Sequence, residues 1–199
     1  MISIFDYGAG NLRSVENALD AIGVEHELIR DAAGIRAATQ IILPGVGHFG
    51  QMMEAIDRMD VRGALLDRIA ACVPFLGICL GLQALFESSE EAPDVRGLGI
   101  FPGQVRRLSD RQRVPHMGWN NLKPIHESRL LAEADPQPYV YFANSYYAPV
   151  IDATVATCDY DGEFTAVIEC ANIFAVQFHP EKSGAVGLRI IQQFTSLCS

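Results

Sequence analysis

The sequence predicts an α/β protein with a mostly parallel central sheet flanked by helices. In the first half of the 199-residue chain, short apolar segments of strand length alternate with helical patterns. Continuous apolar strands separated by helices indicate a parallel sheet that is covered on both faces. From about residue 97 to 169, shorter β-like segments are punctuated by prolines, which indicates a β-rich insertion appended to the sheet. With no linker or internal repeat, the prediction is a single domain over residues 1–199.

The first predicted unit is a strand at 2–5, followed by a loop and a helix. The helix is expected because Leu12, Val15 and Leu19 recur at helical spacing. The later elements follow the same reasoning. They are strands at 24–29, 41–43 and 74–78, helices around 52–59 and 61–71, β-like segments at 139–143 and 165–168, a buried strand at 173–177 and a closing helix with Gly187, Ile190, Ile191 and Phe194 on one face. Ser183 is the expected N-cap of the closing helix.

The composition excludes several classes of protein. There are 15 Lys plus Arg against 24 Asp plus Glu, a net charge of −9, which argues against a protein that grips nucleic acid. No apolar run reaches membrane-spanning length, and the first apolar segment is too short for us to expect a secretory leader. The five cysteines include no C-x-x-C pair, so neither a disulfide framework nor a metal site is expected. We expect a cytoplasmic protein without a cofactor.

The sharpest local signal is the G-x-C-x-G pattern formed by Gly77, Cys79 and Gly81. It follows a predicted strand and opens a predicted helix, as in the nucleophile elbow of hydrolases. In so tight a turn, side chains at 77 and 81 would collide with neighbouring backbone. Amides at the start of the helix would favour the thiolate form of Cys79. The pattern therefore predicts a nucleophile rather than a core cysteine. Without such a context, Cys72, Cys158, Cys170 and Cys198 are expected to be packing residues.

A proton partner for that thiol is expected in the turn that follows the buried strand at 173–177. There His179 and Glu181 flank Pro180. A carboxylate two residues away can bind one ring nitrogen while the other nitrogen faces the thiol. Each residue alone would be read as a strand-end histidine or a helix-start charge. Because both strands end at the same edge of one sheet, the prediction is a Cys79, His179 and Glu181 triad.

A third signal is the glycine-rich loop after the strand at 41–43. Gly45, Gly47 and Gly50 match the G-x-G-x-x-G dinucleotide fingerprint, but the strand is not the first of its unit, and no acidic residue closes the next strand. We favour an oxyanion hole, in which the backbone N–H groups of Val46 and Leu80 bind a developing negative charge. A nucleotide-binding module using residues 45–50 is the alternative from another class. It would leave Cys79 and His179 unexplained.

Together, the elbow, the Pro-Gly-x-Gly loop and the His-Pro-Glu turn resemble the class I glutamine amidotransferases. That resemblance implies a flavodoxin-like sheet and a Cys-His-Glu triad. Further motifs resemble the branch of that family that serves histidine biosynthesis, and the likeness extends to about residue 195. These motifs lie at 6–15, 44–47, 116–120 and 141–146. One departure is Asn144, where the family commonly carries His, and we expect its effect on the glutamine pocket or the subunit face.

The resemblance implies hydrolysis of L-glutamine to glutamate and ammonia through a cysteinyl thioester on Cys79. It also implies a partner, a (β/α)8-barrel cyclase subunit that receives the ammonia and makes imidazole glycerol phosphate. The subunit alone would be poorly active until the peptide between Gly45 and Val46 reorients. By motif position, the glutamine contacts would be Gly45, Gly47, Gln83, Ser145 and Tyr146. The partner contacts would be Asn11, Arg13, Trp119, Asn120 and Lys182, although Asn11 and Arg13 could instead be helix-cap residues.

Three other functions fit the sequence less well than this one. A glutaminase subunit that serves a different synthase is the nearest alternative. A catalytically silent subunit with the same fold would not need the complete triad. A cysteine protease is disfavoured because neither the papain-like nor the caspase signature is present.

Overall fold

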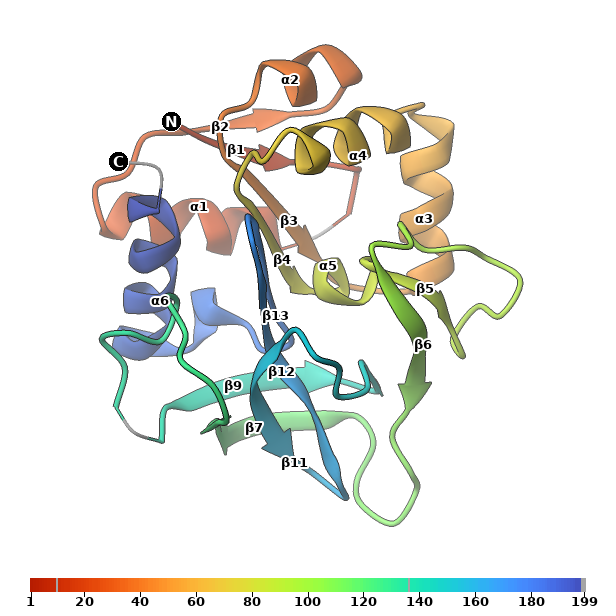
Figure 1. Cartoon of the computed structure of the whole chain (residues 1–199), viewed down its shortest axis with the longest axis vertical. Helices are drawn as coiled ribbons and strands as arrows, with labels where there is room; N and C mark the ends of the chain where they lie inside the picture. Colours follow the sequence, from red (N-terminus) through yellow and green to blue (C-terminus); the bar gives the residue numbers. More distant parts are fainter. Residues whose placement is uncertain (10, 136, 198–199) are drawn as a thin grey trace.

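The computed structural model describes residues 1–9, 11–135 and 137–197. Helices and strands alternate through the first half, and strands dominate the second (Figure 1). The helices are α1 (Leu12–Ala21), α2 (Ala32–Ala37), α3 (Phe49–Arg58), α4 (Arg62–Ala70), α5 (Leu80–Gln83), the 3₁₀ helix η1 (Pro180–Lys182) and α6 (Gly184–Ser196). The strands of the first half are β1 (Ile2–Phe5), β2 (His26–Ile29), β3 (Ile41–Gly45), β4 (Phe75–Cys79) and β5 (Phe86–Ser89).

The strands of the second half vary more in length and are mostly antiparallel. They are β6 (Phe101–Arg107), β7 (His116–Asn121), β8 (Lys123–Pro124), β9 (Tyr139–Asn144), β10 (Tyr146–Tyr147), β11 (Thr154–Asp159), β12 (Glu163–Cys170) and β13 (Ile173–Val176). The central sheet has eight strands in the order β2-β1-β3-β4-β13-β12-β11-β8. Its first five strands are parallel, as the sequence predicted.

The expected insertion at 97–169 is not wholly an appendage. Strands β12, β11 and β8 continue the central sheet in antiparallel orientation, because β12 turns back directly into β13 and pairs with it. The remaining strands form two small sheets, β10-β6-β5 and β7-β9. The first of these includes β5, which precedes residue 97. The boundary drawn from proline content therefore divides strands that hydrogen bonding joins.

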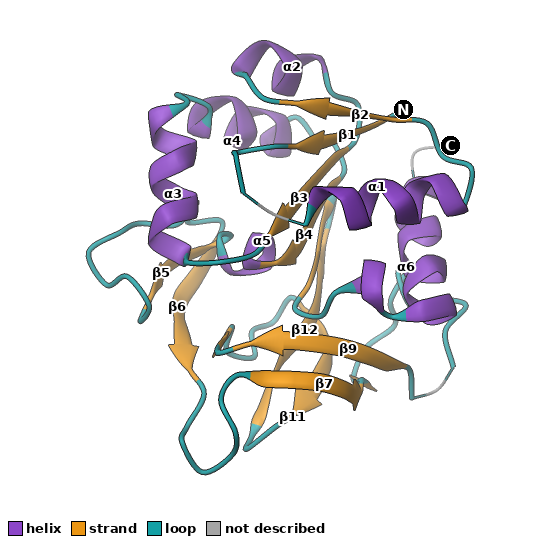
Figure 2. Ribbon diagram, turned by 180° about the vertical axis from the view of Figure 1, so that it is seen from behind, coloured by secondary structure: helices purple, strands orange, loops and turns teal. Residues whose placement is uncertain are grey.

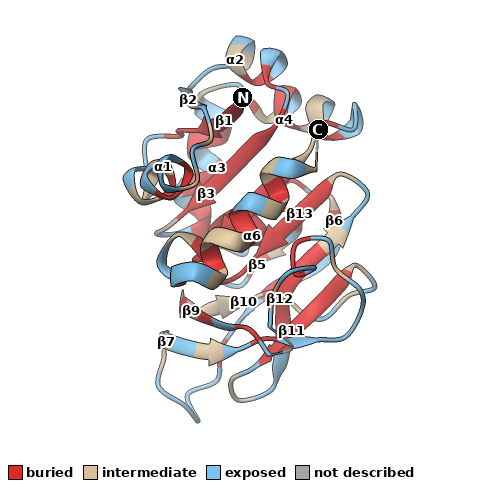
Figure 3. Ribbon diagram, turned by 90° about the vertical axis from the view of Figure 1, so that its left-hand side faces the viewer, coloured by how far each residue is buried: buried red, intermediate tan, exposed pale blue. Residues whose placement is uncertain are grey.

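Helices cover both faces of the parallel strands, and the alternation of side chains explains why. Along β3, Ile41 and Leu43 pack into the layer with α2, α3 and α4, whereas Ile42 packs into the layer with α1 and α6. Figure 2 shows α1 and α6 on one side of the sheet, and Figure 3 shows buried strands beneath helices with exposed outer faces. Burial on both faces requires continuous apolar strands, which is the pattern seen in the sequence.

The closing helix matches its prediction in position but not in its cap. Gly187, Ile190, Ile191 and Phe194 form its buried face, as expected. Ser183 occupies the N-cap position, yet its side chain makes no cap hydrogen bond. The Ser183 hydroxyl donates instead to the carbonyl of His179 at 2.7 Å, and it accepts from the N–H of Tyr141 at 3.0 Å. Ser183 therefore ties the turn after β13 to strand β9.

Candidate active site

Cys79 is the last residue of β4 and lies at a strained turn into α5. Its φ is +55°, a left-handed conformation that side chains other than glycine rarely adopt. A Cβ on Gly77 would lie 2.6 Å from the carbonyl oxygen of Gly81, and a Cβ on Gly81 would lie 2.0 Å from that of Leu43. The expected collisions at both flanking positions are confirmed. Backbone strain of this kind is concentrated at functional sites.

The helix expected after Cys79 is only one turn long, from Leu80 to Gln83. So short a helix has a small dipole, so the predicted support for the thiolate from a helix terminus is weak here. Groups that stabilise the Cys79 thiolate must therefore come from other elements.

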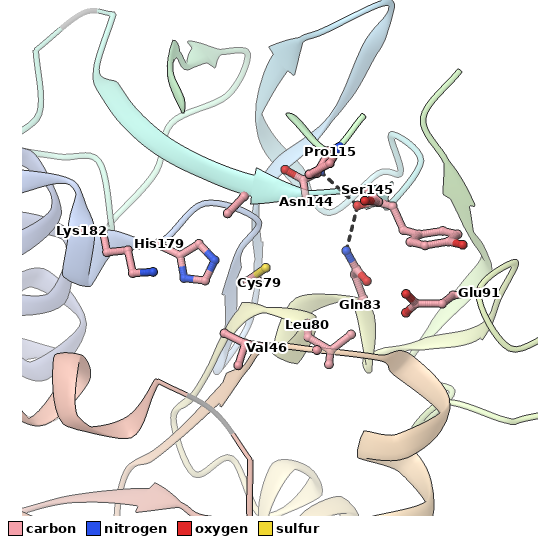
Figure 4. A pocket seen from close by; sticks show the side chains of 13 residues that line it. Val46, Cys79, Leu80, Gln83, Glu91, Pro115, Asn144, Ser145, His179 and Lys182 are labelled. Atoms are coloured by element: carbon pink, nitrogen blue, oxygen red, sulfur yellow. Dashed lines mark hydrogen bonds between the residues drawn. The ribbon is translucent and has the colours of Figure 1, made fainter. Parts of the chain in front are cut away.

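His179 lies beside Cys79, because β13 and β4 are neighbouring parallel strands, and Glu181 lies on the other side of the imidazole. Val176, the last residue of β13, pairs with Ile78, the residue before Cys79. The imidazole Nδ1 of His179 lies 2.8 Å from Oε1 of Glu181, and both side chains are almost completely buried. The N–H of His179 donates to the carbonyl of Tyr141 at 2.9 Å. The ring and the sulfur face each other in Figure 4.

The electrostatics of the pair favour an imidazolium. Burial by itself would lower the pKa of His179. The Cys79 thiolate opposes this effect through its charge and a hydrogen bond, and Glu181 adds a hydrogen bond and its own charge, so the pKa rises from 6.5 to about 10. A pKa raised in this way means that the charged imidazole stabilises the fold fully below about pH 6.5 and that this stabilisation is lost as the pH rises through about 10.

The Cys79→Ala variant tests this coupling. Removing the thiolate is expected to lower the pKa of His179, because burial then acts against the charge with only Glu181 opposing it. The measurement is an NMR titration of the His179 imidazole in the wild type and in the variant. An unchanged titration would show that the sulfur carries no charge next to the ring.

The two chain segments meet in the wall of one cavity of about 320 Å³. Among the predicted site residues, the lining includes Val46, Gly47, Cys79, Leu80, Gln83, Ser145, Tyr146, His179 and Lys182. Glu181 lies behind His179, and Gly45 lies outside the lining. The lining is polar at Gln83, Asn144 and Ser145 and apolar at Val46 and Leu80 (Figure 4).

Local packing accounts for the glycines of the 45–50 loop. A Cβ on Gly45 would lie 2.7 Å from that of Leu80, so this glycine lets α5 approach β3. Gly47 has a φ of +98°, a backbone conformation that glycine adopts without strain and other residues rarely adopt. Burial raises the pKa of Tyr7 to about 12, which keeps its hydroxyl protonated, and that hydroxyl donates to the carbonyl of Val46 at 3.4 Å. The loop at Val46 is thus held between Tyr7 and the cavity.

Two polar residues of the cavity lining were not singled out as functional from the sequence. The carboxylate of Glu91 lines the cavity and accepts from the N–H of Phe49 at 2.7 Å. Its one sequence signal is an acidic pair, Glu90 and Glu91, in a segment without periodicity. Asn144, noted only as a departure from the family, also lines the cavity, and its Nδ2 donates to the carbonyl of Tyr146 at 3.0 Å.

The residues expected at the partner surface lie in three places. Lys182 is at the cavity mouth, and Trp119 is exposed on β7, where it stacks on Tyr139 with ring centroids 5.6 Å apart. The amide of Asn120 donates to the carbonyl of Asp159. At the start of α1, Asn11 is the N-cap residue, and its Oδ1 accepts from the hydroxyl of Ser14. Arg13 is exposed on the same helix.

The other cysteines were expected to be packing residues, and among those that the structure describes this is correct only for Cys158. Cys72 and Cys170 are exposed. Cys72 lies in the turn after α4, and Cys170 is the last residue of β12, just before the turn into β13. Neither side chain reaches the core. Cys198 lies outside the described residues.

The glutamine amidotransferase class-I family model matches residues 3–196. The chain belongs to the class I glutamine amidotransferase family. This amidotransferase is 48% identical to "Imidazole glycerol phosphate synthase subunit HisH" of Methanothermobacter thermautotrophicus, over 99% of this chain and 98% of that protein. It is 46% identical to the protein of the same name in Deinococcus radiodurans, over 97% of this chain and 92% of the relative.

Solved structures support the fold of this amidotransferase. A crystal structure of a glutamine amidotransferase has a TM-score of 0.78 at 17% identity, covering 99% of this chain and 98% of the other. The structure of PurLQS from Thermotoga maritima has a TM-score of 0.79 at 18% identity, covering 100% and 98%. These similarities confirm the predicted flavodoxin-like α/β fold, with a mostly parallel central sheet flanked by helices.

The described residues include neither a membrane-spanning helix nor a cluster of metal-ligating side chains. None of their helices combines the length and apolar character needed to cross a bilayer. In the same part of the chain, no three His, Cys, Asp or Glu side chains are grouped as metal ligands would be.

Proposed function

We propose that this chain, as one domain, is the glutaminase subunit of an imidazole glycerol phosphate synthase. The observation that carries the proposal is the convergence of Cys79 and His179 in one cavity wall, with Glu181 bound to the far nitrogen of the imidazole. The named relatives at 46–48% identity support the choice of synthase. All cysteines in the described part of the chain are free thiols, which suits a reducing cytoplasmic compartment.

In the proposed mechanism, the Cys79 thiolate attacks the side-chain amide carbon of L-glutamine. The carbonyl π electrons move to oxygen, and the N–H groups of Val46 and Leu80 bind the oxyanion. As the tetrahedral intermediate collapses, the C–N bond breaks and the His179 imidazolium protonates the departing amide nitrogen, which leaves as ammonia. Neutral His179 then removes a proton from water, which attacks the thioester and releases glutamate and the Cys79 thiolate.

The substrate contacts follow from the chemistry of the cavity wall. The α-ammonium of glutamine pairs with the carboxylate of Glu91, which is the acidic side chain in the lining. Backbone and side-chain groups of Gly47, Gln83, Ser145 and Tyr146 hold the rest of the substrate. Gly45 shapes this wall from behind by letting Leu80 approach.

The proposed partner surface is the outer face of the β7-β9 sheet. Met117 and Trp119 on β7 and Tyr139 on β9 are large apolar side chains that are 63%, 45% and 51% exposed. Tyr141 lies opposite Trp119, and Ala143, two residues further along β9, lines the cavity. This exposed aromatic face therefore leads to the cavity, where a (β/α)8-barrel cyclase would receive ammonia. Asn11, Arg13 and Lys182 would extend the contact.

The test measures glutamate release from glutamine by the purified chain while a cyclase subunit of this synthase is titrated in. We expect a low rate alone and at least about a tenfold rise at saturation, as expected for a coupling of a few kcal/mol between the subunits. Stimulation by the partner subunit of another glutamine-dependent synthase, and not by this cyclase, would refute the choice of synthase.

A Trp119→Ala variant separates the partner surface from the chemistry. Large aromatic side chains dominate the energy of such interfaces, so the cyclase concentration for half-maximal stimulation is expected to rise about tenfold or more. The rate without the cyclase should not change. The matched control is Val150→Ala, which removes an exposed apolar side chain (47% exposed) outside β7 and β9.

A further inference from the structure

Gln177 is a buried polar side chain for which the proposed mechanism has no role. It follows the last residue of β13, two positions before His179, and it is completely buried. Its backbone N–H donates to the carbonyl of Ala166 at 2.9 Å, which fixes the main chain against β12. Its side-chain amide Nε2 lies 3.6 Å from the sulfur of Cys79, 98 positions away in sequence.

The direction of this amide is set by a main-chain group. The carbonyl oxygen of Tyr146 can only accept, so the amide of Gln83 must present its Nε2, at 2.8 Å. The same Nε2 donates to Oε1 of Gln177 at 3.1 Å. With its oxygen engaged by Gln83, Gln177 presents its N–H₂ group to the sulfur. Tyr146 and Gln83 also line the cavity, so the chain of hydrogen bonds runs from the cavity wall to the nucleophile.

We propose that Gln177 is a hydrogen-bond donor to the Cys79 thiolate, oriented by Gln83 and the carbonyl of Tyr146. The inference rests on the proposed function, because it assumes that the sulfur reacts as a thiolate. A donor to a charged acceptor stabilises the charged form more than the neutral one. The one-turn α5 helix offers little dipole for this purpose, and His179 faces the sulfur from elsewhere in the wall. Gln177 is therefore a catalytic residue in direct contact with the reacting atom, and Gln83 is a positioning residue.

The experiment follows alkylation of Cys79 by iodoacetamide between about pH 5 and pH 9, with each cysteine resolved by mass spectrometry of its peptide. Iodoacetamide reacts with the thiolate and does not need the residues that bind glutamine, so its rate follows the charge state of the sulfur alone. In Gln177→Met, which keeps the length of the side chain but donates no hydrogen bond, the pH of half-maximal Cys79 alkylation should rise by about one unit. Below that midpoint, the rate should fall about tenfold. Exposed Cys72 is the internal reference in every sample.

The matched control is Gln40→Met. Gln40 is also a buried glutamine whose amide donates a hydrogen bond, in this case to the carbonyl of Phe194 at 2.9 Å. Its loss should leave the alkylation of Cys79 unchanged. If Gln177→Met does not fold, Gln83→Met replaces it, because that variant keeps Gln177 but removes the group that orients it. The expected result is then a smaller shift in the same direction.

The proposal is overturned if the folded Gln177→Met protein keeps the wild-type midpoint, or if Gln83→Met does so when Gln177→Met is unfolded. It is also overturned if Gln40→Met shifts the midpoint equally, since the effect would then be general to buried amides. Failure of the proposed function looks different. In that case wild-type Cys79 would react no faster than Cys72 at any pH, whatever residue stands at 177.

Discussion

Replacing Cys79 with alanine is expected to lower the rate of glutamate release by about 10⁴-fold or more, because no other group in the cavity can form the thioester. Cys79 is at the strand-to-helix turn, with its side chain in the cavity wall beside His179. Alanine keeps a Cβ at the same φ of +55°, so the backbone strain does not change. The loss is therefore one of chemistry rather than of folding. The measurement is glutamate production at saturating cyclase, together with mass spectrometry of the trapped acyl-enzyme.

Cys72 provides the matched control for this substitution. It is also a cysteine at positive φ, +60°, but it is exposed in the turn after α4. Cys72→Ala should retain the full rate and the full thermal stability. A Cys79→Ala protein that keeps more than about a tenth of the wild-type rate would exclude Cys79 as the nucleophile, because residual catalysis without a nucleophile is far lower.

The second large effect is expected from Gly81→Ala. The added Cβ would lie 2.0 Å from the carbonyl oxygen of Leu43, which is part of β3 and cannot rotate away. Either the α5 turn or β3 must move, and this movement lowers the free energy of unfolding by about 3 kcal/mol. Since α5 carries Leu80 and Gln83, even a displacement of about 1 Å should also reduce glutaminase activity by about 100-fold.

Urea unfolding and glutamate release, measured on the same preparation, check this prediction. The control is Gly63→Ala in α4, where an added Cβ meets nothing within 4 Å and φ is not positive. That variant should gain about 0.5–1 kcal/mol, the difference in helix propensity between alanine and glycine. If Gly81→Ala resembled Gly63→Ala in stability and rate, the elbow would not depend on the close approach of β3 and α5.

Much of the fold and part of the site were predictable because they depend on local rules. Apolar periodicity located β1, β3, β4 and β13, and the order of strands and helices predicted their parallel pairing. The G-x-C-x-G pattern located the strained turn at Cys79. The expectation that His179 would reach Cys79 needed only two strands ending at the same edge of the sheet, and β4 and β13 are neighbours there.

Other features depended on contacts that have no local signal. Proline content suggested an appended insertion, but hydrogen bonding places β11 and β12 in the central sheet. Ser183 is at the predicted N-cap position, but its hydroxyl makes no cap hydrogen bond and accepts instead from the N–H of Tyr141, 42 positions away. Cys72 and Cys170 were expected inside, although the ends of their elements are at the surface.

The amino-acid order by itself determined the elements and the residue types of the chemistry, because strand period, glycine sterics and the nucleophile motif act within a few residues. Only the tertiary structure decided which polar groups meet. Gln83 and Gln177 are 94 positions apart, and Glu91 reaches the cavity from an irregular segment. The physical reason is that a buried amide or carboxylate is satisfied by whichever partner the packing of distant strands brings within about 3 Å, and no sequence interval encodes that distance.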